Sequence, residues 1–85
     1  MSSIVCKFGG TSIAASDMFR RVKSILQDDA DRRYVVLSAP GRRFPGDEKV
    51  TDLLQRCHAA PGGAAFDSAW EQVRLRFLEI AEGLG

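Results

Sequence analysis

The first feature of the sequence that suggests chemistry is a lysine followed closely by two glycines. Lys7 lies within an apolar run, and Gly9, Gly10, Thr11 and Ser12 follow it. Paired glycines let backbone N–H groups approach an anion closely, and hydroxyl groups add further donors. A lysine beside such a loop can neutralise the charge that spreads over the oxygens of a transferring phosphoryl group. The run therefore favours a phosphate site, although a plain tight turn after a strand would give the same pair of glycines.

This run matches neither of two common nucleotide-binding motifs. A Walker A loop has the pattern Gly-x-x-x-x-Gly-Lys-Ser/Thr, whereas here Lys7 precedes the glycines. The dinucleotide fingerprint Gly-x-Gly-x-x-Gly does not occur in the sequence. Lys7 nevertheless argues against a purely structural turn, because burying an ammonium group costs several kcal/mol unless an anion or a hydrogen-bond partner meets it.

Two later segments also carry residues suited to a small polar substrate. Ser38 and Ala39 open a loop after a second apolar run, and Thr51 stands where a helical pattern begins. Ligands of open parallel α/β sheets bind beyond the carboxyl ends of the strands, so we expect the loops after both strands to lie at one edge. For Thr51, contact with a substrate and simple capping of the helix both remain open.

The elements that must position these residues follow the order strand, helix, strand, helix, helix. Strands are expected at 3–8 and 34–37. Helices are expected at 16 to 28 or 29 with Ser16 as N-cap, from about 49 through 57 until the run Pro61-Gly62-Gly63 stops the pattern, and at 66–84. A helix between two strands implies a right-handed crossover and a parallel sheet. The run at 34–37 shows no alternation, which is typical of a strand covered on both faces.

The last helix has the clearest pattern in the chain. Its apolar residues recur at spacings of four and three, and core packing is the simplest explanation, with a partner-binding surface as the alternative. The apolar set comprises Phe66, Trp70, Val73, Phe77, Ile80 and Leu84, and Arg74, Arg76, Glu79 and Glu82 are expected on the other surface. In the first helix, Met18, Val22, Ile25 and Leu26 are expected to face a core.

Composition excludes several classes of function. The chain has 85 residues, 27% of them charged, and a formal net charge of +1, which gives no electrostatic case for nucleic acid or an anionic membrane. No apolar run approaches the roughly 18–20 residues that span a bilayer. Two isolated cysteines, Cys6 in an expected buried strand and Cys57 beside His58, predict neither a disulfide nor a metal site and favour a reducing cytoplasm.

Three segments in this order resemble the aspartate kinases of the amino-acid kinase family. The run at 5–12 resembles their opening signature, the run at 35–41 their second-strand loop, and the run at 49–54 the threonine-bearing start of the helix that follows. The insert at 42–48 is most similar to monofunctional members of the clostridial type. The resemblance implies an α/β fold, namely the N-terminal part of a carbamate-kinase-like parallel sheet sandwich, with residues 1–85 an incomplete catalytic domain.

The resemblance also implies roles for particular residues. Lys7 would stabilise the γ-phosphoryl group of ATP during transfer to the side-chain carboxylate of L-aspartate. Gly9 and Gly10 would donate backbone hydrogen bonds to the phosphates. The remaining implied roles are loop shaping for Thr11 and Ser12, substrate positioning for Ser38 and Ala39, contact with aspartate for Thr51, and a weaker case for carboxylate contacts by Arg42 and Arg43.

One departure from the family pattern weakens the substrate contact expected near Thr51. Asp52 stands where the family commonly has asparagine. The Thr11-Ser12 pair and the run at 49–52 count against a different acceptor such as glutamate or acetylglutamate.

The resembled enzyme is larger than this chain and uses ATP with Mg²⁺. These 85 residues contain no counterpart of its nucleotide-binding half, of its acidic and arginine-bearing substrate loops, or of its regulatory ACT domains. We therefore expect no activity and no tightly bound cofactor in the chain alone. The competing hypothesis is a non-catalytic fragment that self-associates or binds a partner, and a homo-oligomer is expected in either case.

Overall fold

A computed structural model of the chain describes residues 3–60 and 62–85. The chain has an α/β fold with a small two-stranded parallel sheet, and a short 3₁₀ turn follows the first strand. The elements are β1 (Ile4–Phe8), η1 (Gly10–Ile13), α1 (Ser16–Gln27), β2 (Arg32–Leu37), α2 (Val50–Ala59) and α3 (Gly63–Leu84). Pro61, which was expected to help end α2, lies outside the described residues.

The two strands form a parallel pair, as the crossover predicts. Val5 pairs with Tyr34, Lys7 with Val36, and Phe8 with Leu37. Alternate residues of a strand point to opposite faces of a sheet. Phe8 borders a pocket with residues of α1, so α1 covers that face. Lys7 therefore shares the opposite face with Val5, Tyr34 and Val36.

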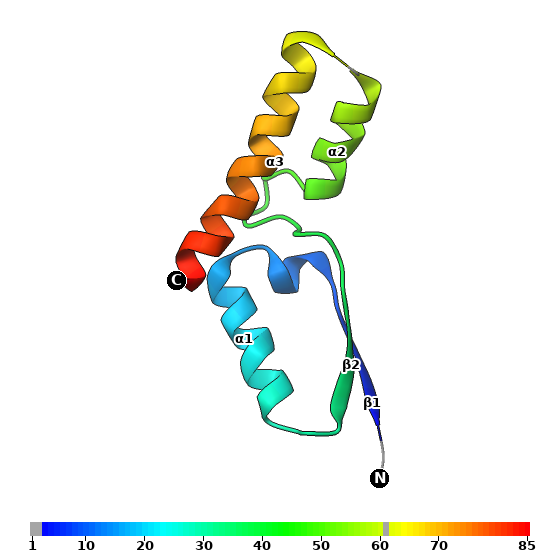
Figure 1. Ribbon diagram of the computed structural model, residues 1–85, viewed down its shortest axis with the longest axis vertical. Coiled ribbons are helices and arrows are strands. Elements are labelled where there is room, and N and C mark those ends of the chain that lie inside the picture. Colours follow the sequence, from blue (N-terminus) through cyan, green and yellow to red (C-terminus); the bar gives the residue numbers. More distant parts are fainter. Residues whose placement is uncertain (1–2, 61) are drawn as a thin grey trace.

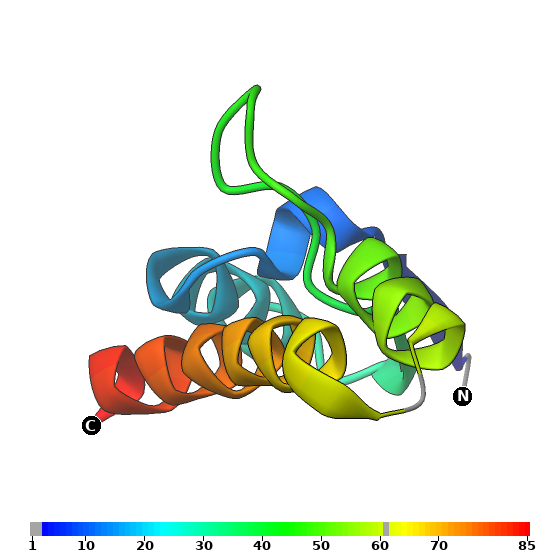
Figure 2. The same cartoon turned by 90° about the horizontal axis from the view of Figure 1, so that it is seen from above.

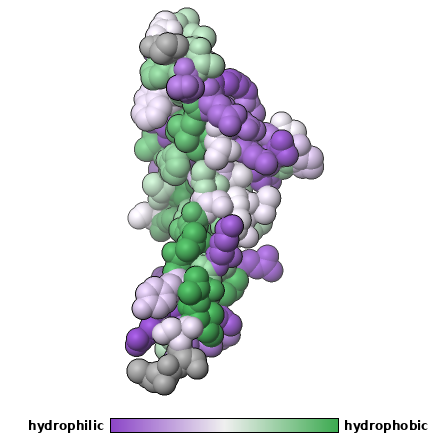
Figure 3. Space-filling model, turned by 90° about the vertical axis from the view of Figure 1, so that its right-hand side faces the viewer, coloured by the Kyte–Doolittle hydropathy of each residue, from purple (hydrophilic) through white to green (hydrophobic). Residues whose placement is uncertain are grey.

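That opposite face is open, which corrects the expectation of a strand covered on both sides. Val5 is 67% exposed, Tyr34 61% and Val36 51%. The view onto the side of the molecule that carries the strands shows hydrophobic surface over its lower part (Figure 3). Within the described residues only α1 covers the sheet, so strands with the composition of a buried sheet remain half exposed. Cys6, which was expected to be buried, is half-buried for the same reason.

The helices α2 and α3 lie side by side at one end of the molecule, and α1 with the sheet forms the other (Figure 1). Val50 and Leu53 of α2 pack with Val73 of α3 in a core that Ala39 also contacts. The C-terminal end of α3 meets the start of α1, where Arg20 Nη2 donates to the carbonyl oxygen of Gly83 at 2.5 Å. The long helix α3 thus connects the two ends.

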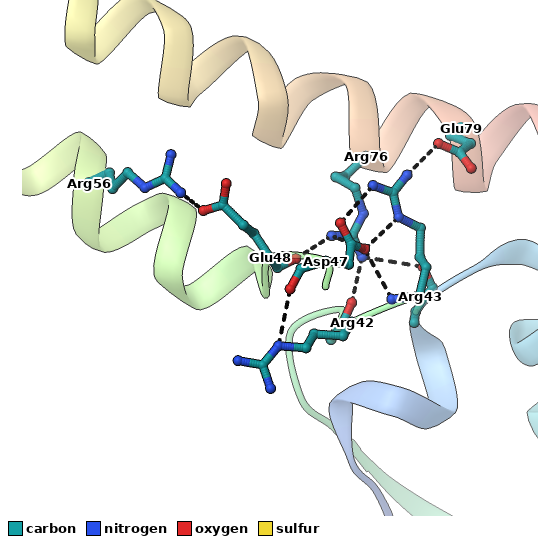
Figure 4. Close-up of polar contacts among 9 residues, drawn as sticks. Arg42, Arg43, Asp47, Glu48, Arg56, Arg76 and Glu79 are labelled. Carbon is teal, nitrogen blue, oxygen red and sulfur yellow. Dashed lines mark hydrogen bonds and ion pairs between the residues drawn. The ribbon is translucent and has the colours of Figure 1, made fainter. Parts of the chain in front are cut away.

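The buried face of α3 differs from the expected one. Its buried residues are Ala69, Val73, Arg76 and Ile80. Trp70 is 50% exposed and Phe77 is 49% exposed, although both belong to the expected core stripe. The expectation that Arg76 lies on the polar surface is wrong, because this arginine points into the junction between α3 and the loops that follow the strands (Figure 4).

The start of α1 also departs from expectation. Ala15, not Ser16, is the N-cap residue, and no side chain caps the helix. Backbone N–H groups of Met18 and Phe19 donate to the carbonyl oxygen of Ala15 at 3.1 and 3.2 Å. Ser16 instead packs so closely on α3 that a Cβ at Gly83 would lie 2.2 Å from its Oγ, which explains a glycine at that crossing.

The molecule is elongated. It measures 53 × 23 × 23 Å with a radius of gyration of 15.3 Å, against about 12 Å for a compact domain of this length. Few of the described residues have buried side chains of more than one carbon, so the packed interior is small. No helix among the described residues is long and apolar enough to cross a membrane.

Candidate functional site

The loops that follow the two strands touch each other directly. The backbone N–H of Gly41 donates to the carbonyl oxygen of Gly10 at 2.8 Å. A Cβ placed at Gly41 would lie 2.7 Å from the carbonyl carbon of Gly10, so any residue larger than glycine would clash with the backbone there. The backbone N–H of Val50 donates to the carbonyl oxygen of Pro40 at 3.0 Å, which joins the start of α2 to the same loops. Three segments distant in sequence therefore meet at one edge of the sheet.

A pocket of about 450 Å³ lies where these segments meet. Five of the eight residues predicted from the sequence line it, namely Gly10, Thr11, Ser38, Ala39 and Thr51. Its other lining residues are Gly41, Arg42 and Lys49. The expectation that both strand-end loops lie at one edge of the sheet is confirmed, and the pocket is large enough for a small polar metabolite.

The pocket carries positive charge. Arg42 and Lys49 are the charged residues of its lining, and both are cationic. Arg42 is held in place by its Nε, which donates to the carbonyl oxygen of Asp47 at 3.1 Å (Figure 4). Lys49 was not predicted as a site residue, although it immediately precedes a helix, where a cation and the free N–H groups of the first turn both favour an anion.

Three predicted site residues do not line this pocket. Lys7 is exposed on the open face of the sheet, and Gly9 is exposed beside it. Ser12 borders a different pocket, of about 260 Å³, between η1 and α1. Because Lys7 is exposed, the cost of burying its ammonium group does not arise in this chain, and its role stays a prediction.

One of the two alternatives for Thr51 is excluded. Lys49 is the N-cap residue of α2, and no side chain caps this helix. Thr51 is the second helical residue, is exposed, and lines the pocket. Its hydroxyl is therefore free to meet a ligand rather than occupied at the helix end.

Arg76 is the principal residue that sequence reasoning missed. It is 4% exposed, and its guanidinium donates to the carbonyl oxygens of Glu48 at 2.7 Å and Gly41 at 2.6 Å. A longer contact reaches the carbonyl oxygen of Ala14 at 3.4 Å, and the carboxylate of Asp47 lies 3.5 Å away. Burial, followed by the nearby charge of Arg43, lowers the pKa of Arg76, but an arginine remains protonated in such surroundings.

An ion cluster closes the outer side of this junction. Arg43 forms a two-pronged pair with Asp47, at 2.7 and 3.0 Å, and a single contact with Glu79 of α3 at 2.9 Å (Figure 4). The hydrogen bond from Arg43, with the charges of Arg43 and Arg76, lowers the pKa of Asp47 to about 2. The guanidinium of Arg43 is therefore paired with carboxylates of its own loop and of α3, whereas Arg42 borders the pocket. The loop that carries both arginines projects from the body of the molecule in the view from above (Figure 2).

The described residues contain no cluster of three or more side chains able to hold a metal ion. Cys6 and Cys57 are both free thiols. The pocket offers hydroxyl groups, backbone N–H groups and cations. Such a set suits carboxylate or phosphate oxygens rather than a bare metal ion.

A parallel βαβ unit whose strand-end loops enclose a cationic pocket is typical of α/β enzymes that bind anionic substrates. Comparison with curated proteins narrows this class. The chain is 47% identical to Aspartokinase 3 of Bacillus subtilis, over 94% of the chain and 18% of that protein. It is 35% identical to the aspartokinase of Chlamydia trachomatis, over 96% of the chain and 17% of that protein. No protein-family model matches the chain.

Solved structures agree with the sequence comparison. The chain superposes on Clostridium acetobutylicum aspartate kinase with a TM-score of 0.92 and 42% identity, over 99% of the chain and 20% of that enzyme. The match to E. coli aspartokinase III in complex with aspartate and ADP has a TM-score of 0.79 and 32% identity, over 95% of the chain and 17% of that enzyme. This chain is homologous to the aspartokinases, and it spans about a fifth of the length of the relatives it matches.

Proposed function

We propose that the chain forms one wall of the substrate site of an aspartate kinase. In that reaction a side-chain carboxylate oxygen of L-aspartate attacks the γ-phosphorus of ATP. The bond to the β,γ-bridging oxygen breaks, and aspartyl phosphate and ADP are formed. The observation that carries the proposal is the cationic pocket at the meeting of the loops that end the strands, in a chain whose homologues are aspartokinases. The E. coli relative was solved with aspartate and ADP.

The residues of this wall supply binding and charge stabilisation. Thr51 and Ser38 offer hydroxyl groups, and Thr11 offers a hydroxyl and a backbone N–H, to substrate oxygens. Arg42 and Lys49 attract aspartate, whose two carboxylate groups are both ionised at neutral pH. Phosphoryl transfer depends almost wholly on such positioning and on neutralising the charge of the transition state.

Lys7 has the role of stabilising the γ-phosphoryl group, with Gly9 and Gly10 as backbone donors to the phosphates. Mg²⁺ carried with ATP neutralises phosphate charge when it is bound. Lys7 faces the open side of the sheet, so the nucleotide must be held against it by protein beyond the described residues. For this reason the 85 residues alone have no kinase activity. The complete enzyme is proposed to work as a homo-oligomer in the cytoplasm.

The experiment that tests the proposal replaces the matching segment of Bacillus subtilis Aspartokinase 3 with this chain. We expect aspartate-dependent release of ADP from the hybrid enzyme and none above background from the 85-residue chain. Lys7→Ala should lower kcat of the hybrid by about 100-fold or more, as loss of a charge-stabilising group does. Lys23→Ala, which changes an exposed lysine of α1, is the matched control and should leave kcat unchanged.

Two results would contradict this proposal. A hybrid that is soluble and folded by circular dichroism but releases no ADP would show that the segment cannot form the site. Aspartate-dependent ADP release by the 85 residues alone, abolished by Lys7→Ala, would show that the rest of the enzyme is dispensable.

A second candidate is a non-catalytic module that associates with itself. The open apolar face of the sheet, with Val5, Tyr34 and Val36, favours it. Activity of the hybrid enzyme would separate the two candidates, because a module shaped only for association has no reason to complete a kinase site.

A further inference from the structure

Arg76 touches all three segments that frame the pocket, although it lies on a helix remote from them in sequence. Ala14 follows η1, whereas Gly41 and Glu48 lie near the beginning and at the end of the loop that joins β2 to α2. The guanidinium reaches the carbonyl oxygen of each, at 3.4, 2.6 and 2.7 Å respectively. Each of these carbonyl groups lies within three residues of a side chain or backbone that lines the pocket.

The contacts are made to backbone atoms rather than to side chains. A carbonyl group cannot rotate away as a side chain can, so its distance from the guanidinium constrains the path of the chain. The planar guanidinium presents several donors at set angles, which an ammonium group does not. Its carboxylate partner, Asp47, is at 3.5 Å and is already paired with Arg43. Arg76 therefore links the loops through hydrogen bonds to their backbone, and its ion pair with Asp47 is secondary.

We propose that Arg76 is a positioning residue for aspartate. By holding the segment after η1 and the two ends of the loop between β2 and α2 at fixed separations, it sets the distance between Thr11 on one side of the pocket and Lys49 and Thr51 on the other. This inference rests on the proposed function, since it assigns Arg76 to the binding of the same substrate. Arg76 itself does not line the pocket and touches no reacting atom.

The test uses the hybrid enzyme with Arg76→Met, Arg76→Lys and, as matched control, Arg74→Met. Methionine keeps an unbranched chain of similar length without donors. Arg74 lies on the same helix, is exposed, and pairs with Glu71 alone. We expect Arg76→Met to lower kcat/KM for aspartate by about 10- to 100-fold, mainly through KM, because small displacements of binding groups have effects of this size. The KM for ATP should change less than about threefold.

Arg76→Lys should recover only part of the loss, since an ammonium group cannot serve three carbonyl groups with the same geometry. Arg74→Met should match the unmodified hybrid. All assays are run well below the melting temperature of each variant, so that loss of fold does not enter the KM. An unchanged KM for aspartate in both Arg76 variants, with only a lower melting temperature, would overturn the inference and leave Arg76 as a residue of the fold.

Hydrogen exchange measured by mass spectrometry gives a second, activity-independent readout. In Arg76→Met, peptides that cover residues 38–50 should exchange faster, whereas peptides from the middle of α1 should not. Equal acceleration in all peptides would contradict a local role. If the unmodified hybrid released no ADP, the proposed function would fail, and the exchange result would still decide whether Arg76 ties the loops.

Discussion

At the scale of single residues, Lys7 and Arg76 illustrate two ways in which a cation can serve an anion site. Lys7 is exposed on an open sheet face, where its charge is available to a ligand brought from elsewhere. Arg76 is buried, and its guanidinium donates hydrogen bonds to backbone carbonyl groups. In the proposed function Lys7 would act through its charge and Arg76 through geometry, so their substitution should affect kcat and KM differently.

Asp47 yields a prediction about acid stability. Its pKa is about 2 in the folded chain, below the ordinary value of 3.8, chiefly because of the hydrogen bond from Arg43. A carboxyl group whose folded pKa is depressed stabilises the fold above the unfolded pKa, and that contribution is lost as the pH falls through the folded pKa. We therefore expect the unfolding free energy of the chain to drop between pH 4 and pH 2, with Asp47 contributing about 1–2 kcal/mol.

Asp47→Asn should remove this contribution and flatten the pH dependence over the same interval. Urea denaturation at a series of pH values would measure it. Asp67→Asn, at an exposed position of α3, serves as the control and should retain the slope. The same slope in both variants would mean that Arg43 and Asp47 do not hold each other in solution.

At the scale of elements, the site depends on how closely two loops approach. A Cβ at Gly41 would lie 2.7 Å from the carbonyl carbon of Gly10 and 3.0 Å from the backbone nitrogen of Thr11. These are backbone atoms, which cannot yield by a change of rotamer. Gly41→Ala should therefore separate the loops and lower the unfolding free energy by about 1–3 kcal/mol, the usual cost of overpacking.

Gly46→Ala is the matched control for that substitution, because a Cβ at Gly46 meets no atom within 4 Å. Its effect should stay within about 0.5 kcal/mol. Thermal melts of the two variants would measure the difference. Equal melting temperatures would show that the loops are free to move apart without cost.

At the scale of the whole molecule, the open sheet predicts association. A two-stranded parallel sheet leaves unpaired N–H and C=O groups on its outer edges, and here one face is apolar as well. We expect the 85-residue chain to form dimers or larger oligomers at high concentration. Val5→Glu, at a position 67% exposed, should weaken association without loss of core packing.

Light scattering over a range of concentrations would test this expectation. Leu54→Glu, which places the same charge on an exposed position of α2, is the control and should leave the oligomer in place. A stable monomer at the highest concentration would contradict the prediction.

Much of the fold follows from local patterns in the sequence. Apolar runs before glycine predict the strands. β2 begins two residues earlier than its apolar part, because Arg32 pairs with Ile4 and a register shift accommodates Arg33. The helices follow from their spacing. The face predicted for α3 is buried only in part. Val73 and Ile80 are buried as expected, but periodicity also favoured the aromatic residues Trp70 and Phe77, whereas packing against the loops buried Arg76.

The candidate site could be predicted only in part, because only some of its residues give a local signal in the sequence. Small and hydroxyl-bearing residues after strands are a local signal, and four predicted ones line the pocket, namely Gly10, Thr11, Ser38 and Ala39. Lys49 gave no such signal, since an exposed lysine before a helix is common. Whether Thr51 caps its helix depended on where α2 begins, and helix ends are the least certain feature of any sequence pattern.

The sequence by itself determined the order of the elements, the parallel pairing and the kinship with aspartokinases, because these depend on short-range patterns and on residue identity. Only the tertiary structure decided which face of α3 is buried, that Arg76 joins the segment after η1 to both ends of the loop before α2, and that Lys7 stands apart from the pocket. Those features depend on contacts between residues 28 to 62 positions apart and on which surfaces the neighbouring elements cover, and neither is encoded in any single stretch of the chain.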